Sequence, residues 1–286
     1  MNQGRKALTR VKISFEAGTI VLTGDGPGLD LLSDLPGMVF DDRIGLLRGP
    51  ATRYREVFAA LYRRSQAGEF LLEDDARSYC ELELAPSAYR EPFPHQSEAL
   101  EAWQAAGSRG VVVLPTGSGK SYVAELAIWK TARSCLVIAP TIDLMNQWYD
   151  LLCATFDCPV GILGGGYHEI ENLTVSTYDS AYLHIERLGN QFALLVFDEC
   201  HHLPSPSYMQ IAEMSIAPFR LGLTATPERS DGRHDTLERL VGPEVYRRGI
   251  KDLAGSYLAE YETVPVHVPL SAEDAEQYHR ARDIYR

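Results

Sequence analysis

The sequence lacks the features that place a protein in a membrane or outside the cell. Among its 286 residues, no apolar run approaches the length of about 20 residues that a membrane-spanning helix needs. Its first residues, MNQGRKALTRVKISFE, carry basic side chains but not the apolar stretch of a signal peptide. We therefore expect a cytoplasmic protein with no membrane contact.

Cysteine is also scarce. The five cysteines are odd in number and scattered, without the closely spaced pairs of a disulfide framework or a zinc site. Reduced thiols are the expected state. A zinc site on Cys153, Cys158 and His168 is the alternative that this spacing argues against.

Positive charge is in short supply. The chain has 27 basic against 39 acidic residues, a formal net charge of −12. This balance excludes a protein that coats nucleic acid by charge alone. It does not exclude a motor, which can hold phosphates through backbone amides and a few arginines.

What is present begins with a small mixed α+β domain over residues 1–88, in which we find no catalytic constellation. Alternation of apolar and polar residues around Ala17-Gly18 predicts a hairpin, and a helical repeat follows it. The elements expected there are strands 11–16 and 19–24, helix 52–64, and short strands 69–72 and 79–84.

Residues 89–257 have a different character, because short apolar runs alternate with helical patterns. This arrangement predicts an α/β domain with a parallel sheet flanked by helices on both faces. Ligands of such sheets bind at the carboxyl ends of the strands. The expected strands are 111–114, 135–139, 160–163, 173–176, 194–197 and 219–223.

Residues 258–286 form the third part, a connecting strand and the start of a helix. Ser271 stands three residues before Asp274, as a helix N-cap would, and a polar helical pattern follows. A helix with so little to pack on leads us to expect that the chain stops short of a partner domain.

A glycine-rich loop follows the strand at 111–114, and a helical pattern follows the loop. In such a loop, backbone amides and the helix N-terminus converge on phosphate oxygens, a lysine reaches the β- and γ-phosphates, and a hydroxyl binds magnesium. The strict pattern has glycine where Leu114 stands, so a chance turn is the competing interpretation. The predicted nucleotide-binding residues are Leu114, Pro115, Thr116, Gly117, Ser118, Gly119, Lys120 and Ser121.

Two carboxylates end the strand at 194–197. Asp198 is expected to hold magnesium and Glu199 to orient and deprotonate an attacking water. An acidic pair alone is more often a solvated loop, but this pair comes 78 residues after Lys120 in an alternating chain. His201 and His202 are adjacent and cannot both face one metal from a helix start.

The strand at 219–223 runs into Thr224-Ala225-Thr226, small residues whose hydroxyls can exchange hydrogen bonds with the acidic pair. A hydroxyl-rich turn before a proline is the competing interpretation. Together, LPTGSGKS, DECH and TAT resemble motifs I, II and III of superfamily 2 helicases. APTIDLMNQW resembles motif Ia, VSTYDSA resembles the element after it, and the stretch 197–234 is similar to the XPB family of repair and transcription DNA helicases. The N-terminal hairpin and helix resemble that family's damage-recognition domain.

The resemblance implies a RecA-like domain of an ATP-dependent DNA helicase or translocase with 3′ to 5′ polarity, using ATP and Mg²⁺. It implies that Gln96 contacts adenine, that Thr116 to Ser121 hold the triphosphate, and that Ser121 and Asp198 hold magnesium. Coupling of hydrolysis to DNA is implied for His201, Thr224, Ala225 and Thr226, and DNA contact for Thr141, Arg229 and Asp231.

The chain departs from the family at two points. Arg229-Ser230-Asp231 stands where the family has Arg-Glu-Asp, and nothing after residue 255 resembles the second RecA-like domain with its arginine finger. Such a finger is worth about 10³-fold or more in rate. We therefore predict that the chain alone binds ATP, hydrolyses it slowly and does not unwind DNA.

Three other functions stay open. The first is a kinase or GTPase acting on small molecules, although we find no guanine-reading segment. The second is a DNA-docking or partner-binding module without motor activity. The third is a translocase on duplex DNA that never separates the strands, since the motifs read backbone and do not distinguish these cases.

Overall fold

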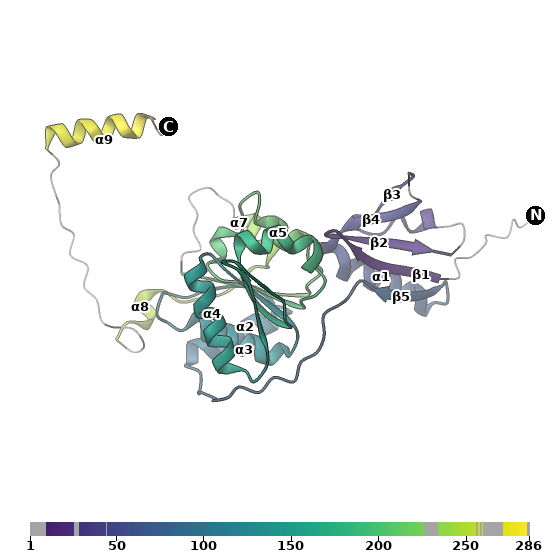
Figure 1. Ribbon diagram of the computed structural model, residues 1–286, viewed down its shortest axis with the longest axis horizontal. Coiled ribbons are helices and arrows are strands. Elements are labelled where there is room, and N and C mark those ends of the chain that lie inside the picture. The colour runs from purple at the N-terminus through teal and green to yellow at the C-terminus, as the bar shows by residue number, and fades with distance from the viewer. Residues whose placement is uncertain are drawn as a thin grey trace, which may run out of the picture.

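The computed structural model describes residues 10–25, 29–43, 45–225, 234–255, 257, 259 and 271–284. A small domain and a larger α/β domain stand side by side, and helix α9 lies apart from both (Figure 1). Helix α9 runs from Ala272 to Ile284, and the Asp274 N–H donates to Ser271 Oγ at 3.1 Å, which confirms the predicted N-cap. Within the described ranges every helix is too short or too polar to cross a bilayer.

The small domain is a five-stranded sheet with the order β3-β4-β2-β1-β5 and one long helix. The predicted hairpin is confirmed: β1 and β2 pair antiparallel, and Ala17 and Gly18 turn the chain with φ of 45° and 75°. Edge strand β3 and its neighbour β4 are short, and the sequence pattern missed them. The bounds are β1 Arg10–Glu16, β2 Thr19–Gly24, β3 Val39–Asp41, β4 Leu46–Pro50, α1 Tyr54–Gln66 and β5 Leu71–Asp75.

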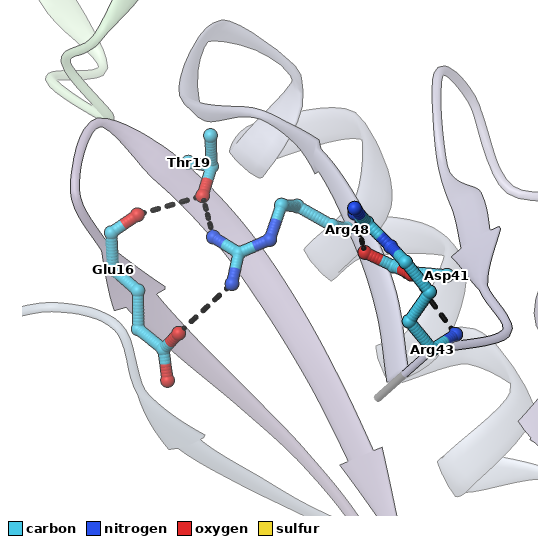
Figure 2. Close-up of polar contacts among 5 residues, drawn as sticks. All are labelled: Glu16, Thr19, Asp41, Arg43 and Arg48. Carbon is cyan, nitrogen blue, oxygen red and sulfur yellow. Dashed lines mark hydrogen bonds and ion pairs between the residues drawn. The ribbon is translucent and has the colours of Figure 1, made fainter. Parts of the chain in front are cut away.

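A polar network fastens β4 to the hairpin turn (Figure 2). Arg48 donates to Thr19 Oγ1 at 2.6 Å and to Glu16 Oε2 at 3.1 Å, while Thr19 Oγ1 donates to the Glu16 carbonyl. At the β3–β4 turn, Arg43 donates to both carboxylate oxygens of Asp41 and holds the pKa of that carboxyl at about 2. These contacts fix the register of the short strands β3 and β4 at this edge of the sheet.

The large domain contains an eight-stranded sheet with the order β13-β6-β12-β11-β7-β10-β8-β9. All pairings are parallel except that of β8 with β9, so the predicted parallel sheet is confirmed. The bounds are β6 Arg109–Val113, β7 Cys135–Ala139, β8 Val160–Gly164, β9 Tyr167–Glu169, β10 Leu173–Thr177, β11 Leu194–Phe197, β12 Phe219–Thr224 and β13 Glu244–Arg247.

Helices cover both faces of this sheet (Figure 1). Alternate strand residues face opposite ways: Val137 belongs to the core beneath α2, α3 and α4, while Leu136 and Ile138 belong to the core beneath α5, α6 and α7. Burial on both faces explains why the strands read as continuous apolar runs. The bounds are α2 Pro94–Ala105, α3 Lys120–Thr131, α4 Ile142–Thr155, α5 Tyr178–Leu188, α6 Met209–Glu213, α7 His234–Leu240 and α8 Ile250–Leu253.

The prediction of a strand at 79–84 is wrong. Residues 77–88 run as extended chain along the large domain, where the Leu82 N–H donates to the Ala132 carbonyl at 2.8 Å. Leu82 and Leu84 pack on the core beneath α3 and α4. The alternation in this segment therefore reflects one side lying on another domain, and only an isolated bridge from Glu81 to Arg133 forms.

The two domains meet at the amino ends of β11 and β12. A Cβ added to Gly18, in the hairpin turn, would lie 2.7 Å from Met214 Cγ. Asn190 Nδ2 donates to the Ala76 carbonyl at 2.9 Å, and Ile216 completes the small domain's own core. The small domain therefore sits at the edge of the large sheet opposite the carboxyl ends of its strands.

Candidate functional site

The phosphate-type loop leaves β6 and enters α3 through two glycines with left-handed backbone. Gly117 and Gly119 have φ of 82° and 83°, which non-glycine residues rarely adopt. A Cβ on Gly119 would also lie 2.3 Å from Gln96 Nε2. The loop therefore requires glycine at 119 for conformation and for close approach.

Lys120, the first residue of α3, folds back over this loop. Its Nζ donates to the Leu114 carbonyl at 3.2 Å. Leu114 itself is fully buried in the core, and its N–H donates to the Thr224 carbonyl at 3.0 Å. Glycine is not needed at this position because the side chain points into the core, away from the loop.

The acidic pair stands at the end of β11. Asp198 Oδ2 accepts a hydrogen bond from Trp148 Nε1 at 2.8 Å, and its Oδ1 accepts one from the Glu199 N–H at 3.1 Å. Burial raises the pKa of Asp198, the neighbouring Glu199 adds to the rise, and the Trp148 N–H and Lys120 oppose it. Glu199 has a φ of 45°, a strained backbone for a residue with a side chain.

One cavity of about 490 Å³ brings the loop and the acidic pair together. Lys120, Asp198 and Glu199 all open into it. Helix α4 supplies the opposite wall with residues that the sequence reasoning missed, although their spacing is that of one helix face. The lining residues are Thr116, Gly117, Gly119, Lys120, Ser121, Leu144, Gln147, Trp148, Leu151, Asp198 and Glu199. Leu114, Pro115 and Ser118 are absent from this lining.

Thr224, at the end of β12, closes a triangle with the acidic motif. His201 Nδ1 lies 3.1 Å from Thr224 Oγ1 and 3.3 Å from Glu199 Oε2. Thr224 Oγ1 in turn donates to Glu199 Oε2 at 3.4 Å. Three residues from the two motifs thus share one hydrogen-bonding network that a change at Glu199 would alter.

Gln96 lies beside a second cavity of about 410 Å³. Its Nε2 donates to the Ser118 carbonyl at 3.1 Å, and its Oε1 accepts from the Phe93 N–H at 3.0 Å, so its amide holds the loop in place. Four lining residues are shared with the first cavity. The second cavity is lined by Arg90, Glu91, Phe93, Gln96, Gly117, Ser118, Gly119, Ser121, Tyr122, Glu125, Leu151 and Tyr257.

The residues predicted to touch DNA are only partly within the described structure. Thr141 is the N-cap of α4, and its Oγ1 accepts from the Leu144 N–H at 3.3 Å. Thr177 caps α5 in the same way after strand β10, next to β7 in the sheet. Ala225 is described, whereas Thr226, Arg229 and Asp231 lie outside the described residues.

Among the described residues, no group of three or more His, Cys, Asp or Glu side chains is placed to hold a metal ion. Cys153, Cys158 and His168 all fall within the described ranges. His201 and His202 are adjacent in the short 3-10 turn Cys200–His202. The oxygen donors of the first cavity, Ser121 and Asp198, are instead the ligand type that Mg²⁺ prefers.

Two family models match the chain, one in each domain. Residues 13–68 match the damage recognition domain of xeroderma pigmentosum group B helicase. Residues 90–229 match the res subunit of type III restriction enzymes. The two matches lie on either side of residues 69–89, which lead from the small domain to the large one.

The chain is similar in sequence to part of two longer proteins and in fold to a solved helicase structure. The DNA 3'-5' translocase XPB2 of Sulfurisphaera tokodaii is 40% identical over 261 residues, which cover 87% of this chain and 56% of that protein. The DNA 3'-5' helicase XPB of Mycobacterium tuberculosis is 33% identical over 221 residues, 72% of this chain and 40% of that one. The UvsW helicase from Bacteriophage T4 aligns with a TM-score of 0.47 at 17% identity, over 84% of this chain and 100% of that chain. The chain therefore spans about half the length of the first relative and less of the second.

Proposed function

The chain belongs to the XPB family of DNA helicases and translocases over the part of those proteins that it spans, and from that premise we propose that it is the ATP-binding part of a 3′ to 5′ DNA motor. One observation carries the proposal: Lys120, Asp198 and Glu199 open into the same cavity. A nucleoside triphosphate with its metal is the ligand that needs an ammonium and two carboxylates at one place.

The loop and α3 bind the phosphates in this proposal. Backbone amides of 116–121 and the α3 N-terminus supply donors, and Lys120 exchanges the Leu114 carbonyl for phosphate oxygens. Ser121 and Asp198 hold Mg²⁺, which neutralises charge on the β- and γ-phosphates when bound. Leu114 and Pro115 act only through the backbone, since neither lines the cavity.

Glu199 orients and deprotonates the attacking water. Its Oε2 already accepts from Thr224, and His201 lies within 3.3 Å, so its carboxylate is held at the cavity edge. A change at the triphosphate then alters the hydrogen bonds of Thr224 at the end of β12. This is the proposed coupling route, with Ala225 and Thr226 continuing it along the chain.

The second cavity is proposed to receive adenine. Phe93 and Tyr257 place their ring centroids 5.0 Å apart at its rim, which offers aromatic surface to a base. Gln96 is positioned to contact the base while it holds the Ser118 carbonyl.

DNA is proposed to cross the carboxyl edge of the sheet, where Thr141 and Thr177 begin two helices. Amides at helix starts bind backbone phosphates without reading sequence, which suits a motor with a net charge of −12. Arg229 and Asp231 are proposed to contact DNA as well. The arginine finger is proposed to come from a second RecA-like domain, and the location is proposed to be cytoplasmic.

The test is ATP turnover with and without DNA, beside a Lys120→Ala variant. DNA-stimulated turnover that this substitution abolishes supports the motor. Turnover that transfers phosphate to a small molecule and ignores DNA would favour a kinase. DNA binding without any nucleotide effect would favour a docking module, and a strand-displacement assay separates a helicase from a translocase on duplex DNA.

A further inference from the structure

Two aromatic side chains hold Asp198, and neither belongs to the glycine-rich loop or to the acidic motif. Trp148 Nε1 donates to Asp198 Oδ2 at 2.8 Å, from helix α4. The Tyr178 hydroxyl donates to the Asp198 backbone carbonyl at 3.0 Å, from helix α5. The residue at the end of β11 is thus fastened from two helices on opposite faces of the sheet.

The contact with Trp148 leaves little freedom to the carboxylate. Trp148 is 4% exposed and Asp198 is 9% exposed, so water does not compete for this hydrogen bond. An indole N–H is a donor only and points in one direction, and a bond to a carboxylate is stronger than one between neutral groups. Oδ1 is held separately by the Glu199 N–H, so both oxygens have fixed positions while each retains a further lone pair.

Trp148 also lines the cavity in which we propose that the nucleotide binds. It lines the 490 Å³ cavity together with Ser121 and Lys120, so its ring is part of the wall that the triphosphate would meet. Its helix begins at Thr141, at the sheet edge where we propose that DNA crosses. A rigid helix therefore joins that edge to the carboxylate over two turns.

We propose that Trp148 is a positioning residue that presents the Asp198 carboxylate to the magnesium of the bound nucleotide. The proposal rests on the proposed function, since it assigns the metal to Asp198. The Trp148 proposal adds to the proposed function that one indole N–H, from helix α4, determines how tightly metal and nucleotide bind together.

The test compares nucleotide affinity with and without metal in the full chain. A fluorescent ATP analogue is titrated in excess Mg²⁺ and again in EDTA, for the wild type and Trp148→Phe. We expect the Mg²⁺-dependent gain in affinity to fall about tenfold in Trp148→Phe, the order of one hydrogen bond to a charged group. The affinity in EDTA should change much less, because phenylalanine keeps an aromatic ring in the cavity wall, and binding in EDTA also shows that the variant is folded.

Trp103→Phe is the matched control. Trp103 is equally buried, and its Nε1 donates to the Arg220 carbonyl at 2.9 Å, outside the cavity. This variant loses a comparable hydrogen bond and should keep the full Mg²⁺ effect. If it loses the Mg²⁺ effect as Trp148→Phe does, general loosening explains both and the inference is wrong.

Fluorescence gives a second readout, because the chain has three tryptophans. With Trp103 and Trp129 both changed to phenylalanine, Trp148 is the one tryptophan left, and its emission should shift with Mg²⁺–ATP but not with ATP in EDTA. If Trp148→Phe retains the whole Mg²⁺ effect, or if its nucleotide affinity falls equally in EDTA, the inference about Trp148 is wrong but the proposed function stands. A wild type whose nucleotide affinity ignores Mg²⁺ overturns the proposed function as well.

Discussion

Arg220, near the amino end of β12, is a charged residue that is only 1% exposed. Its guanidinium donates only to main-chain carbonyls, those of Ala212, Ser215, Ala217 and Leu240. Ala212 lies in α6 and Leu240 ends α7, so the cation meets the negative ends of short helices. Burial lowers the pKa of Arg220 to about 9, which leaves it charged at neutral pH.

Replacing Arg220 with methionine should therefore destabilise the chain by about 3 kcal/mol or more, since several buried carbonyls lose their donor at once. Urea unfolding followed by circular dichroism measures this loss. Arg239→Met is the control, because Arg239 is an exposed partner of Glu213 and should change stability by less than about 1 kcal/mol. Equal effects of the two substitutions would contradict the assigned role.

Glu125 gives a pH-dependent prediction. It is 5% exposed on α3, and burial raises its pKa above the ordinary value of 4.5, partly opposed by the Thr155 hydroxyl and Arg90. The folded state thus binds this proton more tightly than the unfolded state, so the residue destabilises the fold increasingly as pH rises above about 4.5. Glu125→Gln should raise the melting temperature relative to the wild type, by more at pH 8 than at pH 5.

Thermal melts at the two pH values measure this difference. Glu101→Gln, on the exposed face of α2, is the matched control and should show no such trend. A Glu125→Gln advantage that shrinks as pH rises would mean that the carboxylate is stabilised in the fold, against the direction given by burial.

At the scale of elements, the β1–β2 turn is one of the parts of the small domain that meet the large one. Gly18 and Gly68 both have left-handed backbone, with φ of 75° and 80°, but only Gly18 is crowded. A Cβ at Gly18 would meet Met214, whereas a Cβ at Gly68 would have no atom within 4 Å. Comparing substitutions at Gly18 and Gly68 therefore distinguishes the effect of backbone strain from the effect of the domain contact.

Gly18→Ala and Gly68→Ala should both lose about 1 kcal/mol through backbone strain. Gly18→Ala should lose more, and should also expose residues 77–88 to protease, since the domains no longer fit together. Denaturant midpoints and limited proteolysis measure the two effects. Identical behaviour of the variants would show that the turn does not contribute to the contact.

The sequence predicted the elements whose hydrophobic pattern results only from burial in the core of their own domain. Strands such as Cys135–Ala139 and Leu194–Phe197 are buried on both faces, so their apolar runs matched the structure to the residue. Strands β9 and β13 were missed because they are short edge strands with polar residues. Residues 79–84 misled because their alternation comes from packing on another domain.

The candidate site divides in the same way. Lys120, Asp198 and Glu199 could be read from the sequence because each follows a strand end in a parallel sheet. Trp148 could not, since a tryptophan at helical spacing looks like any core residue until its N–H is seen to meet a carboxylate. The sequence predicted that Gln96 contacts adenine. Its hydrogen bond to the backbone of the loop depends on the tertiary structure and could not be predicted from the sequence.

At the scale of the whole molecule, this chain spans 56% of the Sulfurisphaera tokodaii translocase. Hydrolysis in the proposed motor needs an arginine from another domain. The chain alone should therefore bind ATP yet turn it over at least about 10³-fold more slowly than a protein extended to the relatives' length. Steady-state ATP hydrolysis by both proteins checks this, and comparable rates would show that the cavity is complete without the second domain.

The position of the small domain has a mechanical consequence. It is attached behind the sheet, at Gly189–Asn190 and Met214–Ile216, while the nucleotide edge lies at the far ends of the same strands, about 15–20 Å away. A ligand bound to the small domain would therefore move together with it as one rigid body, connected to the nucleotide edge by β11 and β12. A small tilt of the sheet at the nucleotide edge would therefore move the far side of the small domain through a larger arc.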